Sequence, residues 1–180
     1  MDRGTGMAFG MAVGLMAGLI LVVILLKFAN RDKKIRTEYD ERQKNIRNKG
    51  YVVGFYSLVA VLAVESLWAV TGIGFPLPDF VMYFVSIIIG ITVMCSYCIW
   101  NGVYWGMNND PRRYAVIWVV ALALNAFPVI HAVRNGSLTS ADPYDALPWY
   151  NIIVIAMFVI IGAVALIRKL ADRATGGEED

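Results

Sequence analysis

Five apolar runs, separated by polar segments, restrict the fold of this chain more than any other feature. Each run is 18 to 21 residues long, and together they contain a single formally charged side chain, Glu65. A helix that rises about 1.5 Å per residue needs roughly 20 residues to cross about 30 Å of hydrocarbon. The sequence therefore predicts five transmembrane helices, at residues 7–26, 51–70, 80–100, 114–133 and 150–167.

The composition excludes the main alternatives to a membrane protein. Apolar residues make up 58% of the chain and charged residues 17%, which is not the balance of a soluble or a disordered domain. The strands of a transmembrane barrel would alternate polar and apolar residues over about 10 positions, and none of the five runs alternates. We therefore expect an all-α integral membrane bundle that forms one domain over residues 1–180, with a disordered tail at about 174–180. The net charge of +2 is too small for a nucleic-acid-binding surface.

The distribution of Lys and Arg predicts the orientation of the bundle. Fourteen of the 16 basic residues lie in segments 27–49 and 101–113 or after residue 167. Because cationic segments resist translocation, these three should lie on the inner side of the plasma membrane. We therefore expect the N-terminus outside and the C-terminus inside. A cleaved signal peptide is the alternative interpretation of 7–26, but its strong positive charge follows the apolar run instead of preceding it.

A stripe of glycines distinguishes the first predicted span. Gly6, Gly10, Gly14 and Gly18 recur every four residues, so one helix face lacks side chains. Such a face lets a second helix approach closely, and the contact then depends on van der Waals fit. The partner helix could belong to the same chain or to a second copy in a homo-oligomer, and the sequence leaves both open.

The segment between the first two runs is strongly basic and has the pattern of a helix. Thr37 can cap its start, and the helix is expected to run over about 37–49 and to lead into the second span. Basic side chains near an anionic membrane leaflet each contribute about 1 kcal/mol of attraction. Four of them are candidates for binding a cytoplasmic or membrane protein partner or anionic lipid, unless they only determine topology: Arg36, Arg42, Lys44 and Arg47.

The same junction resembles a known group of proteins. Its residues are Glu38-Tyr39-Asp40-Glu41-Arg42-Gln43-Lys44, then Arg47, Lys49-Gly50-Tyr51 and Gly54-Phe55-Tyr56. They are similar to a "YDERQ" junction in small multi-span membrane proteins of unknown function from Gram-positive bacteria. The resemblance covers about 20 of the 180 residues. It implies a role in signalling, immunity or the response to membrane stress, and it identifies no catalytic residue.

Glu65 is the main candidate for function inside the membrane. A carboxylate there costs at least about 2.5–3.5 kcal/mol unless it is paired, solvated or protonated. It should therefore face the inside of the bundle, where it could carry a proton or bind a cation. At helical spacing it shares a face with Gly54, Leu58, Val61, Trp68 and Gly72.

Other polar residues of the predicted spans could accompany Glu65. Asn125 and His131 lie in the fourth span on either side of Pro128, which interrupts helical hydrogen bonding, and Tyr83 and Ser86 lie in the third. One interpretation is a pocket that opens outward and binds a ligand or a proton, with Glu65 as anion, His131 as titrating neighbour and Asn125 as its floor. The other is a buried Glu65 that keeps the helices in register.

Catalysis has little support in the sequence. The chain contains no phosphate-binding loop, nucleophile elbow or zinc-protease motif, and we expect no catalytic residue, no metal site and no cofactor. Cys95 and Cys98 are interpreted as small buried residues. The expected function is that of a non-enzymatic membrane protein that binds a partner or a small ligand. The alternative is a proton- or cation-coupled transporter, or an oligomeric channel, that uses Glu65.

Overall fold

The computed structural model describes residues 39–75, 77–105, 111–139 and 147–176, and seven single residues before position 21. The chain divides into two units, Met1–Glu38 and Tyr39–Asp180. Most of the first predicted span, including Gly14 and Gly18, lies outside the described residues. Gly6 and Gly10 have helical backbone. The first span and its glycine stripe therefore stay predictions, and the fold is described for the second unit.

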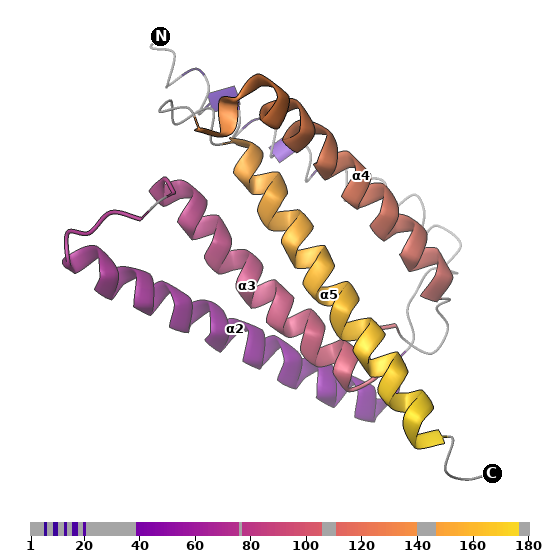
Figure 1. The fold of residues 1–180 in the computed structure, drawn as a ribbon. Helices are drawn as coiled ribbons and strands as arrows, with labels where there is room; N and C mark the ends of the chain where they lie inside the picture. Colours follow the sequence, from indigo (N-terminus) through magenta and orange to yellow (C-terminus); the bar gives the residue numbers. More distant parts are fainter. Residues whose placement is uncertain are drawn as a thin grey trace. The chain divides into compact units, whose positions relative to one another are not determined.

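The described part of the second unit is helical (Figure 1). Its four long helices are α2 (Glu41–Val70), α3 (Asp79–Trp100), α4 (Pro111–Asn135) and α5 (Leu147–Gly176), and a short 3-10 helix, η1, covers Ser137–Thr139. Each of these four helices has the length and the apolar composition needed to cross a membrane. They confirm that residues 51–70, 80–100, 114–133 and 150–167 lie in helices of the predicted length and apolar character.

The four helices pack in an order that differs from their order in the sequence. α3 packs against both α2 and α5, and α4 packs against α5. Figure 1 shows the resulting row, in which α5 separates α4 from α3. The interface of α3, α4 and α5 contains buried Cys95, Ile99 and Ile161 with the Trp118 ring against them. Cys95 and its neighbour Cys98 are both buried free thiols.

The start of α2 corrects the expected helix start at Thr37. Asp40 is the N-cap, with extended backbone, and its carboxylate accepts a 2.6 Å hydrogen bond from the Gln43 amide. The Gln43 side chain in turn accepts a hydrogen bond from the Asp40 amide, which completes a capping box. From there α2 continues through Gly50 without a break for 30 residues. The part of the basic segment from Glu41 onward and the second predicted span thus belong to one helix.

Glycines allow α2 and α3 to approach closely. A Cβ atom added to Gly54 would lie 2.8 Å from both the Gly90 carbonyl oxygen and the Met94 Cβ, and one added to Gly50 would lie 2.8 Å from the Cys98 Sγ. Small residues in this arrangement let membrane helices gain van der Waals contact along their backbones. The Gly50-x-x-x-Gly54 pair, which was not identified as a packing motif from the sequence, therefore determines this crossing.

Candidate functional site

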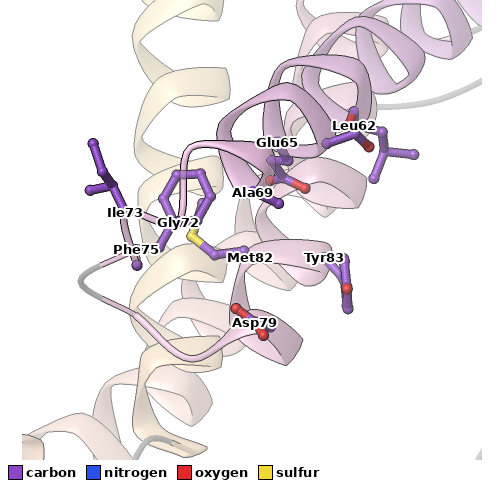
Figure 2. A pocket seen from close by; sticks show the side chains of 11 residues that line it. Leu62, Glu65, Ala69, Gly72, Ile73, Phe75, Asp79, Met82 and Tyr83 are labelled. Atoms are coloured by element: carbon purple, nitrogen blue, oxygen red, sulfur yellow. Dashed lines mark hydrogen bonds between the residues drawn. The ribbon is translucent and has the colours of Figure 1, made fainter.

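A cavity of about 380 Å³ lies between the last turns of α2 and the first turns of α3. The ribbons of the two helices diverge from their glycine crossing toward the loop that connects them (Figure 1). Both helices and the loop contribute to the walls (Figure 2). The residues that define its chemistry are Leu62, Glu65, Phe75, Asp79, Met82 and Tyr83.

Glu65 is the buried charge of this cavity. Its side chain is on α2, and the residue is only 9% exposed. One carboxylate oxygen, Oε1, accepts a 2.7 Å hydrogen bond from the Ser86 hydroxyl of α3. The other, Oε2, is buried and has no hydrogen-bond partner among the described residues. A buried acceptor without a donor costs about 1–3 kcal/mol, and more when it is charged. The structure therefore leaves one strong acceptor unsatisfied on a side chain that lines the cavity.

Ser86 is positioned by its own helix. The residue is fully buried, and its Oγ also lies 3.2 Å from the carbonyl oxygen of Met82, four residues earlier. A serine inside a helix commonly donates a hydrogen bond to the carbonyl four residues earlier. The Ser86 hydroxyl therefore has a second acceptor available when it does not donate to Glu65. The Glu65–Ser86 pair joins α2 to α3, as the sequence analysis allowed. Tyr83, one turn before Ser86, lines the same cavity.

The loop between α2 and α3 is held in place by local contacts. Gly72, just after the C-cap of α2, has a positive φ of 71°, a conformation that favours glycine. The Trp68 indole then donates a 3.0 Å hydrogen bond to the Ile73 carbonyl, and its ring stacks on Phe75 with centroids 5.6 Å apart. These contacts place the Phe75 ring at the cavity wall, as Figure 2 shows.

The electrostatic character of the cavity is acidic. Asp79, the first residue of α3, is exposed and contributes a second carboxylate (Figure 2). None of the described lining residues is a Lys, Arg or His. Clefts lined by one sign of charge concentrate ions of the opposite sign. Within the residues that the structure describes, no three His, Cys, Asp or Glu side chains are grouped to hold a metal ion.

Two predicted companions of Glu65 are not part of this cavity, and that expectation is corrected. Neither Asn125 nor His131 lines it. The Asn125 amide donates to the Ala121 carbonyl of its own helix at 2.8 Å, and exposed His131 lies 3.2 Å from the Asn135 amide nitrogen. The reason is the packing order, because α4 packs against α5 while the cavity lies between α2 and α3.

The candidate basic residues lie at the other end of α2. Arg42 and Lys44 are exposed, and Arg36 lies outside the described residues. The Arg47 guanidinium is 3.9 Å from the centre of the Tyr39 ring and donates a 3.2 Å hydrogen bond to the Tyr51 hydroxyl. Arg47 and Glu65 are 18 residues apart, or roughly 27 Å along a helix. The basic end and the cavity are therefore separate sites.

The sequence interpretation missed four of the residues that define the chemistry of the cavity: Leu62, Phe75, Asp79 and Met82. The short connection between the second and third spans could have predicted that Asp79 lies near Glu65. A short connection between antiparallel helices brings the last turn of one beside the first turn of the next. Glu65 and Asp79 flank this connection, so their carboxylates could have been expected in one place.

No protein-family model matches the chain, and neither a curated protein nor a solved structure matches it. The resemblance of the basic junction to small membrane proteins of Gram-positive bacteria stays a prediction. Function is therefore inferred from the chemistry of the cavity.

Proposed function

We propose that this chain is a non-enzymatic integral membrane protein that binds a small ligand in the cavity between α2 and α3. The observation that carries the proposal is the buried Oε2 atom of Glu65, which has no donor among the described residues. A carboxylate inside a membrane segment is costly, and such residues usually mark a ligand or ion site. A ligand that donates a hydrogen bond to Oε2 would offset this cost.

The proposal includes the orientation of the chain. Residues 7–26 form a fifth span, the N-terminus lies outside, and the segments rich in Lys and Arg lie inside the plasma membrane. The connection between α2 and α3 then lies on the outer side, so the cavity opens away from the cytoplasm. The distribution of basic residues supports this arrangement.

Access to the cavity can be tested by labelling Ser66, which lines it. In a chain whose Cys95 and Cys98 are replaced by alanine, Ser66→Cys should react on intact cells with a membrane-impermeant thiol reagent that carries a trimethylammonium group. The matching sulfonate reagent should react about tenfold more slowly, because an acidic cleft raises the local concentration of cations by about tenfold or more. Mass spectrometry of the purified protein measures the labelled fraction.

Leu67→Cys in the same background is the matched control. Leu67 is the next residue of α2, 73% exposed and outside the cavity lining, so in the proposed arrangement it faces lipid and should stay unlabelled by both reagents. Equal labelling of the two positions would contradict a water-accessible cavity. Labelling of Ser66→Cys only in opened cells would contradict the outward orientation.

The basic end of α2 is proposed as the contact for a cytoplasmic partner or for anionic lipid, in a signalling role. The support is that Arg42 and Lys44 are exposed on the same uninterrupted helix that carries Glu65. Arg42→Glu with Lys44→Glu should remove proteins or anionic lipids that co-purify with the chain, as measured by mass spectrometry. Arg134→Glu, at the end of α4, should remove none. If the double variant keeps every co-purifying species, the basic segment only determines topology.

A transporter or an oligomeric channel is the second candidate, favoured by the acidic side chains that line the cavity. A transporter or channel requires Glu65 to take part in the movement of the ion, and not only in its binding. Reconstituted protein would then move protons or cations across vesicles, and Glu65→Gln would abolish that movement. Binding without flux favours the binding protein.

A further inference from the structure

We propose that the ligand of the cavity is a primary organic ammonium ion with a small apolar body. This rests on the proposed function, because it names the ligand class of the same site. Two carboxylates, from Glu65 and Asp79, contribute to the lining, and no described lining residue carries a positive charge that could neutralise them. The charge of an ionised carboxylate here must then be balanced by the ligand, by solvent cations or by a bound proton, and only a cationic ligand also uses the remaining walls of the cavity.

The buried oxygen of Glu65 specifies the head group of the ligand. Oε1 already accepts the Ser86 hydroxyl at 2.7 Å, whereas Oε2 has no partner among the described residues. A primary ammonium carries three N–H donors, so one can satisfy Oε2 in a charge-assisted hydrogen bond. A quaternary ammonium has the charge but no donor, and would leave Oε2 unsatisfied.

The remaining walls of the cavity specify the body of the ligand. The Phe75 ring, the Tyr83 ring and the apolar side chains of Leu62 and Met82 line the same space as the carboxylates. An aromatic face attracts a cation that lies within about 6 Å of it, and apolar walls favour a hydrocarbon group. A bare alkali ion would leave these walls unused. The volume of about 380 Å³ is near the lower end of ligand pockets, which suits a small amine.

Phenethylamine is a suitable probe, with phenethyl alcohol as its neutral counterpart and phenethyltrimethylammonium as its quaternary counterpart. Each is titrated against the purified full chain in lipid nanodiscs, and binding is followed by calorimetry. Phenethylamine should bind at least about tenfold more tightly than either counterpart, since only it supplies both the charge and a donor. Glu65→Gln should weaken phenethylamine binding at least about thirtyfold, as for a buried charge pair that loses one partner.

Control variants distinguish binding at this site from partition of the amine into the bilayer. Glu41→Gln makes the same chemical change at the far end of α2, where the side chain is exposed, and should leave the affinity unchanged. Asp79→Asn should weaken binding less than Glu65→Gln does, because the Asp79 carboxylate is solvated.

Other outcomes would overturn the ligand class, and they bear differently on the proposed function. Equal affinity for the primary and quaternary probes would contradict a hydrogen bond from the ligand to Oε2. Phenethylamine binding that survives Glu65→Gln would contradict the location of the ligand at Glu65. Binding of Na⁺ or K⁺ that Glu65→Gln abolishes, without amine binding, would overturn the organic ligand and leave the proposed function intact. Absence of all binding, with Ser66→Cys as unreactive as Leu67→Cys, would overturn both.

Discussion

Replacement of Gly54 by leucine is expected to separate α2 from α3 and to lower the free energy of unfolding by about 3 kcal/mol or more. The new Cβ would lie 2.8 Å from the Gly90 carbonyl oxygen and from the Met94 Cβ. Because one of these atoms belongs to the backbone, a side-chain rotation cannot relieve the clash, and the helices must move apart. Thermal unfolding of the purified protein in nanodiscs measures the effect.

Gly162→Ala provides the matched control for Gly54→Ala, the smaller change at the same position. Gly162 is also in a long apolar helix, α5, but a Cβ added there meets its nearest atom, in the Trp118 ring, at 3.8 Å, which is ordinary van der Waals contact. Alanine should therefore be tolerated at Gly162, whereas Gly54→Ala should already destabilise the protein. If Gly54→Leu unfolds at the same temperature as Gly162→Ala, the close approach of α2 and α3 does not exist in the membrane.

Glu65→Met is expected to abolish phenethylamine binding and to raise the free energy of unfolding by about 1–2 kcal/mol. Methionine has a similar length and removes the buried oxygen that has no donor among the described residues, and such an unsatisfied group costs about 1–3 kcal/mol. The Ser86 hydroxyl keeps an acceptor, because the Met82 carbonyl oxygen lies 3.2 Å from it. Calorimetry measures the loss of binding, and thermal unfolding measures the gain in stability.

The sign of the stability change decides between the two interpretations of Glu65. A residue that costs stability but is needed for binding is typical of a functional site. If Glu65→Met instead lowers the free energy of unfolding by several kcal/mol, the carboxylate holds α2 and α3 in register, and the ligand site is refuted. Ser86→Ala helps to distinguish a ligand-binding Glu65 from one that only holds the helices in register. It removes the hydrogen bond between α3 and Glu65 but keeps the Glu65 carboxyl group.

The structure brings together three of the five polar residues that the sequence grouped: Glu65, Ser86 and Tyr83. The helical spacing that places Glu65 on the face of Gly54 agrees with the structure, in which both residues are buried. Ser86 and Tyr83 lie beside the same cavity, because the third span follows the second through a short loop. Asn125 and His131 were assigned to the cavity because they are polar and lie on either side of Pro128 in the fourth span. A polar residue beside an interrupted turn does not show which helices pack together, so this pattern could not identify their neighbours.

The sequence by itself determined that the described part of the chain forms four helices long and apolar enough to cross a membrane, because a spanning helix must match the thickness of the hydrocarbon and satisfy its own backbone hydrogen bonds. Only the tertiary structure decided which helices meet. Apolar faces that contact lipid and those that contact another helix have similar composition, so hydropathy does not distinguish them. The choice depends on the fit of small residues such as Gly54 against Gly90, and that fit brings Glu65, Ser86 and Asp79 to one cavity.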